Sequence, residues 1–496
     1  MNQHICVTKV RFLIRLIIIC LGLLMAGCSA PSPNAEHPNI LFISIDTLRS
    51  DHMGCYGYER NTTPNIDKIA KNGVVFENMM SASSWTLPSH ASMLTGKYPP
   101  AHGLQDDGVI LNEEIPVLAD ILKEQGYYAI GVVSHIYVSS MFGLDRGFDI
   151  FDDSLLLKGK VNPKAEAVVN RFLEHANKIE NQRYFAFLHF FDPHWDYKPP
   201  RPFNAKFTDP NYKGPVDGTQ HSLIPFMSRD AVMPKADRQH AIDLYDGEIA
   251  YVDDQIGKLI KRLQAMRLMR DTVIIITSDH GEEFKEHGSL GHGKTLYEEQ
   301  LSVPLIISGS NKLSSGINPS EVISTCDLAP TILNLTGNKK ISQLKFDGNS
   351  ISRSKDDSEK VVFAETIRFG YEKRAARLDQ YKAIHHFEGN EKLFFDLQED
   401  EKEQQALVSD PTNGILTNHL MIFNAAMDSG WHLKLIASEP MRCIGNITTT
   451  DRFTDLRHYF SRRIAGTGIK LNKFKLGPKR KEIVFDIIVK GIGEVV

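Results

Sequence analysis

The sequence is poor in cysteine and lacks an excess of positive charge. Six cysteines are spread over 496 residues, and only Cys55, Cys326 and Cys443 lie beyond position 28. Their wide spacing excludes a disulfide framework and a Cys-x-x-Cys metal motif. We interpret them as structural thiols, with one disulfide between two of them left open. The formal net charge of −4 gives no indication of a nucleic-acid partner, although a locally positive site for an anionic substrate is still allowed.

An apolar stretch of membrane-spanning length is also lacking near the N-terminus. The basic residues Lys9, Arg11 and Arg15 precede the stretch LIIICLGLLMAGCSA. This stretch is far shorter than the roughly 20 apolar residues of a spanning helix, and small residues follow it, as is typical of a secretory signal. We therefore assign residues 1–27 to a signal peptide and expect export to the cell envelope.

The signal ends in Met25-Ala26-Gly27-Cys28, which resembles a bacterial lipobox, although leucine is more usual three residues before the cysteine. The resemblance implies that Cys28 is lipidated and attaches the protein to a membrane, with residues 28–38 as a Pro/Ser tether. Ser29 favours the outer membrane, and the periplasmic face is the alternative. Plain cleavage near this point and an uncleaved anchor are the other interpretations.

What is present is a globular composition, with 42% hydrophobic and 24% charged residues, and two apolar runs that end in carboxylates. Residues 39–46 read NILFISID, and residues 272–280 read TVIIITSDH. Continuous runs of this kind are typical of strands that are buried on both faces of a sheet. Asp46 and Asp279 would then lie at the carboxyl ends of strands, where α/β folds bind their ligands.

Helical patterns alternate with these runs. In the clearest one, which begins at His240, apolar residues follow three- and four-residue spacing and form one face. These residues are Ile242, Tyr245, Ile249, Val252, Ile256, Leu259 and Leu263. The alternation predicts an α/β fold with a mixed, largely parallel central sheet flanked by helices. The polar, Pro/Gly-rich residues 205–240 are expected to form a long surface loop beside the site.

The pattern changes after about Gly337. The segments VVFAET, YKAIHHF and KLFFDL are predicted as short strands of a small antiparallel subdomain, and DLQEDEKEQQALVSD as a loop that leads into a helix. Further on, WHLKLIAS and EIVFDIIVKG also alternate like strands. We therefore assign residues 39–345 to a catalytic domain, 346–430 to a C-terminal α+β subdomain and 431–496 to a β-rich extension.

Four stretches hold the side chains that suit catalysis or metal binding. They read SIDTLRSDHMGCYGY, SSWTLPSHASMLTG, FLHFFDPHWDYKPP and TSDHGEEFKEHGSLGHGKTLYEEQLSVPLII. Their polar candidates are Asp46, Thr86, His189, His194, Asp279, His280, His287, His292 and Lys294. At these stretches the chain resembles the sulfatase family of the alkaline-phosphatase superfamily. The resemblance runs from about Pro38 to Gly337 and, more weakly, through KLFFDL, and it implies the fold of that family and an ester hydrolase.

The resemblance implies one divalent metal ion, with Asp46, Asp279 and His280 as ligands and Thr86 adding an alkoxide oxygen. Two carboxylates, an imidazole and an alkoxide suit an ion of intermediate hardness. Thr47 stands where many sulfatases have a second aspartate, and His280 stands where a calcium-binding sulfatase often has asparagine. These departures favour zinc or manganese, with calcium as the alternative.

The resemblance also assigns catalytic roles. Thr86 occupies the position of the nucleophile, at a helix N-terminus whose N–H groups and dipole favour a bound anion. Lys294 occupies the lysine of the family's GHGK segment and can neutralise charge on the substrate oxygens. A histidine, either His194 in a stretch similar to the family's HxPHxPY or His292, could protonate the leaving alcohol.

Thr86 and His90 depart from the family pattern. Sulfatases carry cysteine or serine followed by x-P-x-R, and they oxidise that residue to formylglycine, whereas this run reads Thr-Leu-Pro-Ser-His. Threonine cannot form the aldehyde whose hydrated form expels sulfate, but water can attack a phosphorylated threonine at phosphorus. Threonine serves as nucleophile in related nucleotide pyrophosphatases and in lipoteichoic-acid and phosphoethanolamine transferases. The departure therefore favours phosphoryl chemistry.

Simpler interpretations are available for several residues. Thr86 could only cap a helix, and Asp46 could be a turn residue. We expect His189 to be a core histidine, His287 to be a loop residue and Arg49 to pair with a neighbouring carboxylate, although Arg49 could reach the substrate. His135 lies near the histidine of the family's GKWH region. The acidic residues Glu282, Glu283 and Glu286 are expected to form a solvated face.

The sequence as a whole predicts an exported, lipid-anchored hydrolase that cleaves a phosphate mono- or diester through Thr86. The alternatives are a sulfuric-ester hydrolase that works without formylglycine and a transferase that passes the phosphoryl group to an alcohol. A catalytically inactive binding lipoprotein is the alternative from another class. The expected partner is a small-molecule, glycan or lipid ester, and the natural substrate and oligomeric state stay open.

Overall fold

The computed structural model describes residues 37–157, 163–310, 318–351, 360–368, 372–428, 441–448, 469–476 and 482–489. The predicted signal peptide, the proposed lipid site Cys28 and most of the tether lie outside the described residues. The predicted strand WHLKLIAS lies outside them as well.

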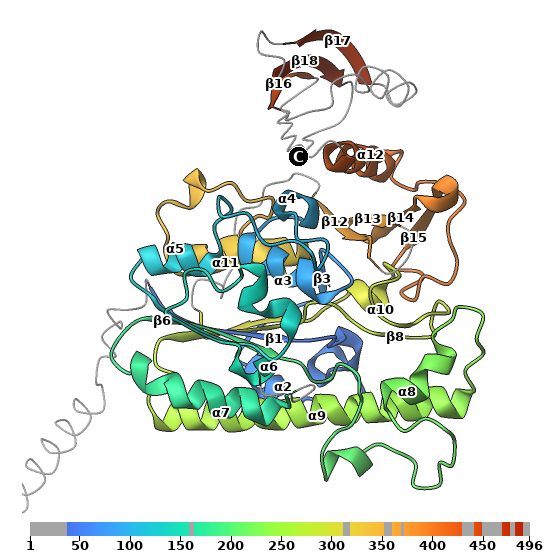
Figure 1. Cartoon of the computed structure of the whole chain (residues 1–496). Coiled ribbons are helices and arrows are strands. Elements are labelled where there is room, and N and C mark those ends of the chain that lie inside the picture. Colours follow the sequence, from blue (N-terminus) through green and yellow to red (C-terminus); the bar gives the residue numbers. More distant parts are fainter. Residues whose placement is uncertain are drawn as a thin grey trace, which may run out of the picture.

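A seven-stranded sheet forms the centre of residues 39–308 (Figure 1). Its strands follow in the order β2-β10-β7-β1-β6-β4-β5. β10 is antiparallel to both of its neighbours, and the other adjacent pairs are parallel. The strands are β1 (Asn39–Ile45), β2 (Gly73–Phe76), β4 (Tyr128–Val132), β5 (Ile150–Asp152), β6 (Tyr184–Phe190), β7 (Thr272–Thr277) and β10 (Leu305–Ser308). This arrangement confirms the predicted mixed, largely parallel sheet.

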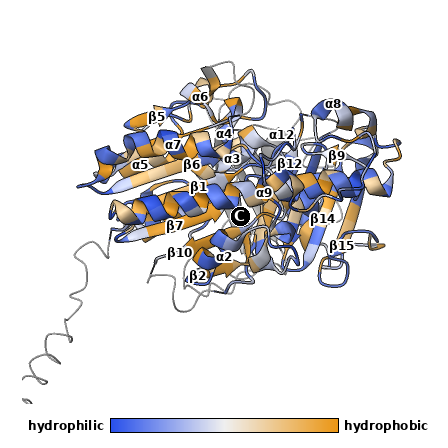
Figure 2. Ribbon diagram, turned by 90° about the horizontal axis from the view of Figure 1, so that it is seen from below, coloured by the Kyte–Doolittle hydropathy of each residue, from blue (hydrophilic) through white to orange (hydrophobic). Residues whose placement is uncertain are grey.

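Helices cover both faces of this sheet because its central strands are apolar on both sides (Figure 2). Alternate residues of β1 point to opposite faces, so Leu41 and Ile43 join one hydrophobic core while Ile40 and Phe42 join the other. The first core is closed by α2 (Pro64–Ala70), α7 (Ala165–His175) and α9 (Lys235–Ala265). The second is closed by α3 (Thr86–Thr95), α5 (Leu118–Glu124) and α11 (Leu328–Leu335).

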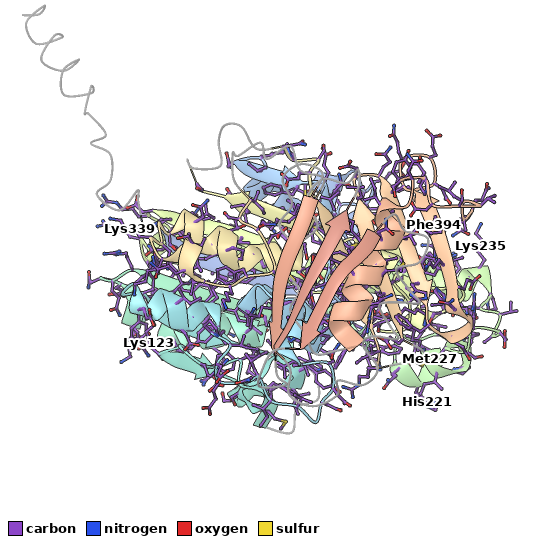
Figure 3. All side chains as sticks on the ribbon, turned by 90° about the horizontal axis from the view of Figure 1, so that it is seen from above. Lys123, His221, Met227, Lys235, Lys339 and Phe394 are labelled. Carbon is purple, nitrogen blue, oxygen red and sulfur yellow. The ribbon has the colours of Figure 1, made fainter. Side chains whose placement is uncertain are left out.

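Helix α9 contains the amphipathic pattern that the sequence predicts. Six of the seven periodic residues are buried and Ile242 is partly buried, so this face packs on the sheet as expected. The helix begins at Lys235, earlier than the pattern indicates. The residues before it are mostly irregular, with a short α8 (Gln220–Leu223). Figure 3 places His221, Met227 and Lys235 at the same end of the molecule, opposite Lys123.

Short elements connect the layers. Two small sheets pair β3 (Asn78–Met80) with β11 (Val322–Ser324) and β8 (Glu283–Phe284) with β9 (Leu290–Gly291). The remaining short helices are α4 (Pro99–His102), α6 (Ser154–Leu157) and α10 (Glu298–Leu301). In the part of the chain that the structure covers, no helix combines the length and apolar character needed to cross a bilayer.

The C-terminal part contains the predicted antiparallel sheet, which has four strands where the sequence indicates three. Its strands follow in chain order and are β12 (Val361–Thr366), β13 (Lys373–Leu378), β14 (Tyr381–His386) and β15 (Glu391–Asp396). Helix α12 (Ile415–Asp428) packs on it through Leu416, Leu420 and Phe423. A separate antiparallel sheet comprises β16 (Met441–Thr448), β17 (Ile469–Leu476) and β18 (Glu482–Val489).

Candidate active site

Two adjacent strands of the central sheet place three polar side chains together. Asp46 follows β1, and Asp279 with His280 follows β7. Because β1 and β7 are parallel neighbours, their carboxyl ends meet at one edge of the sheet. All three residues are fully buried, and one ligand atom from each lies within 4.8 Å of the other two. The structure therefore brings together three of the four residues that the sequence predicts as metal ligands.

Thr86, the fourth, is the first residue of α3. Its Oγ1 lies 3.3 Å from Nε2 of His280. Trp85, which precedes it, offers no side-chain cap, and every residue of α3 is buried. The first-turn N–H groups and the positive end of the helix dipole are therefore directed at a site from which water is largely excluded, an arrangement that favours an anion.

His280 presents a lone pair to the other members of the cluster. Its Nδ1 lies 2.9 Å from the carbonyl oxygen of Gly281, which can only accept, so Nδ1 carries the proton. Nε2 is left as an acceptor, 3.4 Å from Asp279 Oδ2 and 3.8 Å from Asp46 Oδ1. An imidazole that is oriented through one nitrogen and free at the other has the typical arrangement of a metal ligand.

The two carboxylates lack enough donors for their oxygens. Asp279 Oδ1 accepts from the backbone N–H groups of Thr47 and His280, at 3.1 Å and 2.9 Å. Asp279 Oδ2 and both oxygens of Asp46 are buried and accept no hydrogen bond from any described residue. Burial, together with the nearby Asp279 charge, raises the pKa of Asp46 well above its usual range, and burial also raises the pKa of Asp279. Three orphaned carboxylate oxygens beside an imidazole lone pair fit a divalent cation.

A buried carboxylate orients His292. Glu282 Oε1 lies 2.9 Å from His292 Nδ1, and Glu282 Oε2 accepts from the hydroxyl of Tyr197 at 2.9 Å. The ring of His292 lies 4.4 Å from that of His280, centroid to centroid. Burial lowers the pKa of His292 to about 3 and raises that of Glu282. With Nδ1 held by the carboxylate, Nε2 of His292 is the nitrogen available to a substrate.

The expectation of a solvated acidic face is therefore wrong. Glu282 and Glu283 are fully buried, and the Glu286 side chain is only 21% exposed and accepts from Arg49 at 2.8 Å. Glu283 accepts from the backbone N–H of Ser289. These carboxylates are held inside by hydrogen bonds to residues on other segments, such as Tyr197 and Arg49, and local sequence composition does not reveal such contacts.

His194 and His135 extend the row of imidazoles. The ring of His194 lies 4.8 Å from that of His292 and stacks on Phe191 at 4.4 Å, while His135 stacks on the same phenylalanine at 4.7 Å. His194 Nδ1 donates to the carbonyl oxygen of Trp195 at 2.8 Å, and burial lowers its pKa to about 3. His194 thus lies in the site without a carboxylate to orient it.

Lys294 lies two residues beyond His292 and is half-buried. Burial lowers its pKa, and among the residues that the structure describes it forms no salt bridge or hydrogen bond. The carbonyl oxygen of Gly293, between the two residues, accepts from the hydroxyl of Thr366 on β12 at 2.7 Å. The C-terminal sheet therefore holds the loop that carries both side chains.

Other predicted polar residues serve the framework. Arg49 pairs with Asp51 at 2.7 Å, as expected, and it also donates to the carbonyl oxygen of Glu282. His287 stacks on Tyr297, and its Nδ1 lies 2.7 Å from Glu299 Oε1. His287 is thus more than a loop residue, since it ties the segment between β8 and β9 to α10.

Sequence reasoning did not assign a role to the layer behind the carboxylates. His189 Nε2 lies 3.4 Å from Asp46 Oδ2, and His90 Nδ1 lies 3.4 Å from Asp279 Oδ2. Ser44 of β1 contacts His90 at 2.9 Å. A polar residue inside an otherwise apolar buried strand, such as Ser44 or His189, is the signal that could have indicated this layer.

The fold and the site together define an α/β ester hydrolase with a candidate metal centre. A sulfatase family profile matches residues 38–338, and the chain belongs to the sulfatase family. A second profile, for the C-terminal region of N-sulphoglucosamine sulphohydrolase, matches residues 285–423. The match includes the loop of His292 and Lys294 as well as the four-stranded sheet.

Relatives of known activity cover most of the chain. A Delta 4,5-hexuronate-2-O-sulfatase of Bacteroides thetaiotaomicron is 24% identical, over 80% of this chain and 90% of its own length. An ulvan-active sulfatase of Formosa agariphila is 27% identical, over 77% of this chain and 79% of its own. The structure of a phosphonate monoester hydrolase of Agrobacterium radiobacter matches with a TM-score of 0.61 and 20% identity, over 79% of this chain and 95% of that one. This structural match confirms the fold.

Proposed function

We propose that this protein hydrolyses phosphate esters through Thr86. The observation that carries the proposal is the position of the Thr86 hydroxyl. It lies at the N-terminus of a buried helix and 3.3 Å from His280, in a cluster with three carboxylate oxygens that have no hydrogen-bond donor. A threonine cannot become formylglycine, so the route by which related sulfatases release sulfate is closed to it. Water can instead release a phosphoryl group from threonine by attack at phosphorus.

Asp46, Thr86, Asp279 and His280 would hold one divalent ion, and their oxygen and nitrogen donors favour zinc or manganese over calcium. When bound, such an ion lowers the pKa of a coordinated hydroxyl and polarises the ester oxygen. The candidate donors all belong to a buried framework, so their positions are set by β1, β7 and α3 before any substrate arrives.

The chain's own residues account for two displacements. In the first, Thr86 Oγ1 attacks as an alkoxide and forms a bond to phosphorus while the bond between phosphorus and the ester oxygen breaks, and the departing alcohol takes a proton from Nε2 of the charged His292. In the second, water attacks phosphorus and gives a proton back to His292. Thr86 is released as an alkoxide, and inorganic phosphate leaves from a monoester or a phosphate monoester from a diester. Burial lowers the pKa of both His292 and His194 to about 3, so each needs a partner to carry a proton. His292 is the better candidate because the Glu282 carboxylate, 2.9 Å from its Nδ1, opposes that effect by stabilising the charged imidazole. Lys294 can offset charge on the phosphoryl oxygens.

A sulfate ester is the second candidate, because the relatives named above include sulfatases and the chain belongs to their family. Transfer of the phosphoryl group to a sugar or lipid alcohol is the third. The phosphonate monoester hydrolase with the same fold supports phosphorus chemistry only by analogy. Export with attachment through Cys28 belongs to the proposal as well, with a glycan, lipid or small-molecule ester of the cell envelope as substrate.

A paired assay tests the proposed reaction. Aryl phosphate, aryl phosphodiester and aryl sulfate are offered to the wild type and to Thr86→Ala and Thr86→Ser, each with Mn²⁺, Zn²⁺ or Ca²⁺. We expect phosphoester turnover in the wild type, loss of at least about 10³-fold in Thr86→Ala and partial activity in Thr86→Ser, because serine keeps an alcohol nucleophile. Sulfate turnover above phosphate turnover in the wild type, or full activity in Thr86→Ala, would contradict the proposal.

A further inference from the structure

Two buried histidines stand behind the two carboxylates of the site. His189 is on β6 and His90 is on α3, and their rings meet edge to face with centroids 4.9 Å apart. Ser44 of β1 stands directly opposite His189 in the parallel register. All three residues are fully buried, so strand pairing and helix packing fix this layer from the core side.

The hydrogen bonds of His90 show which of its nitrogens carries the proton. Nδ1 lies 2.9 Å from the carbonyl oxygen of Thr86, which can only accept, so Nδ1 is the donor. Nε2 therefore accepts from the hydroxyl of Ser44 at 2.9 Å. His90 connects β1 to the first turn of the nucleophile helix, and both of its nitrogens are engaged.

His189 has one nitrogen engaged and one unengaged. Its Nδ1 receives the backbone N–H of Ser134 at 3.4 Å, while the Ser134 hydroxyl donates to the carbonyl oxygen of His189 at 2.7 Å. The Ser134 hydroxyl oxygen lies 3.3 Å from the same nitrogen. Because the backbone N–H can only donate, we assign the acceptor role to Nδ1 and the proton to Nε2. That Nε2–H is buried without a hydrogen-bond acceptor among the described residues, and Asp46 Oδ2, 3.4 Å away, is buried without a donor.

We propose that His189 is a positioning residue for the metal centre, a role that rests on the proposed function and its ion. Its Nε2 lies 3.4 Å from Asp46 Oδ2 and would hold that oxygen, which would leave Asp46 Oδ1, 3.8 Å from His280 Nε2, for the ion. Outer-shell partners of this kind orient the ligands of a metal, and their loss typically weakens metal affinity by about 10- to 100-fold. Pairing the two groups would also give each of these buried polar atoms, His189 Nε2 and Asp46 Oδ2, the partner that it otherwise lacks.

Two substitutions separate this role from a purely structural one. In His189→Asn the short amide can still accept from the Ser134 N–H, but nothing reaches Asp46. In His189→Gln the longer amide can place an N–H near the position of Nε2. If His189 acts through Asp46, Asn weakens metal binding and Gln restores it, whereas a role through Ser134 alone predicts the reverse order.

The measurement is calorimetric titration of Zn²⁺ or Mn²⁺ into chelator-treated full-length protein, with folding checked by circular dichroism. We expect the dissociation constant of His189→Asn to rise by about 10- to 100-fold and that of His189→Gln to stay within a few-fold of the wild type. His175→Asn is the matched control, because the ring of His175 also faces a carboxylate, Asp152 at 2.7 Å, on α7 away from the site. It should leave metal affinity unchanged.

Equal affinity in the wild type and His189→Asn, or weaker binding in Gln than in Asn, overturns the role of His189 while the metal centre itself stands. A wild type that binds neither ion overturns both the metal centre and the role that depends on it. The two failures are therefore distinct, and turnover is not needed to tell them apart.

Discussion

At the scale of single residues, the contact with Glu282 distinguishes His292 chemically from the other histidines of the site. Three imidazoles, those of His194, His280 and His292, lie in a continuous row with centroid separations of 4.4 Å and 4.8 Å. His292 alone among these three has a carboxylate at hydrogen-bond distance from its Nδ1. A proton carrier needs such a partner, since the partner stabilises the charged ring in a buried site.

This difference predicts how Glu282→Gln behaves. The amide keeps the volume of the side chain but supplies only one acceptor oxygen, where the carboxylate serves both Tyr197 and His292. We expect kcat for alkyl phosphate esters to fall by about 10²-fold, because their alcohols leave poorly without a proton. A nitrophenyl ester, whose phenolate leaves without help, should be nearly unaffected.

The measurement compares kcat for the two esters in the wild type and the variant at one pH. Metal content, determined by elemental analysis, is the control and should not change. An equal loss for both esters would assign Glu282 to the framework or the ion and would remove His292 from proton transfer.

Two of the predicted site residues that the structure brings together follow buried strands. Asp46 and Asp279 each end a run of apolar residues, and the rule that strand ends meet at one edge is sufficient to bring them together. The burial of Glu282 was not predicted, because Glu282, Glu283 and Glu286 lie in a mostly polar segment and such segments usually face solvent. Its partner Tyr197 lies 85 residues away along the chain, and its partner His292 lies 10 residues away. No local sequence pattern encodes either contact.

At the scale of elements, His287 joins the segment between β8 and β9 to two other parts of the chain, and we call His287 with its partners Glu299 and Glu403 the histidine clasp. His287 Nδ1 lies 2.7 Å from the carboxylate of Glu299 on α10, and His287 Nε2 lies 3.0 Å from the backbone carbonyl oxygen of Glu403. Both partners accept, so both nitrogens donate when the ring is charged. The hydrogen bond to Glu299 raises the pKa of His287, in opposition to its burial.

The clasp should therefore stabilise the fold in a pH-dependent way. Because the pKa of folded His287 is raised above its value in the unfolded chain, the stabilisation is complete below the ordinary histidine pKa of 6.5 and is lost as the pH rises through the folded pKa. We expect His287→Leu to lower the free energy of unfolding by about 1.5–3 kcal/mol at pH 6 and by less at pH 9.

Denaturant unfolding of both proteins at the two pH values measures this difference, and other titrating groups cancel because they are common to both. A destabilisation that is equal at pH 6 and pH 9 would mean that His287 contributes only its packing on Tyr297, with ring centroids 3.5 Å apart.

The elements themselves were largely predictable. The buried strands β1 and β7 are continuous apolar runs, and α9 has apolar residues at helical spacing, so the local sequence is enough to predict all three. Strand β13 was not predicted, because its segment Lys373–Leu378 reads KRAARL and its charged residues mask the alternation. Arg374 and Arg377 are nonetheless buried there, and Arg377 Nη2 donates to Asn78 Oδ1 at 2.7 Å.

At the scale of the whole molecule, the C-terminal sheet completes the site. The end of β12 contacts the chain on both sides of the cluster: the Ser83 hydroxyl, just before Thr86, donates to the carbonyl oxygen of Glu365 at 2.8 Å, and the Thr366 hydroxyl donates to Gly293 at 2.7 Å. Helix α3, which begins at Thr86, and the loop of His292 are thus held by the same strand. The four-stranded sheet is therefore joined to the loops of the site through these two hydrogen bonds.

The central claim is that Thr86 carries the phosphoryl group during turnover. Its most direct test is to mix the protein with a phosphate ester, quench it in acid within the first turnover and map the peptide that contains Thr86 by high-resolution mass spectrometry. High mass accuracy is needed because phosphoryl and sulfuryl adducts are nearly isobaric. The account predicts a phosphoryl adduct on Thr86 that is absent from Thr86→Ala. An adduct on another residue, or a sulfuryl adduct formed only with a sulfate ester, would contradict it.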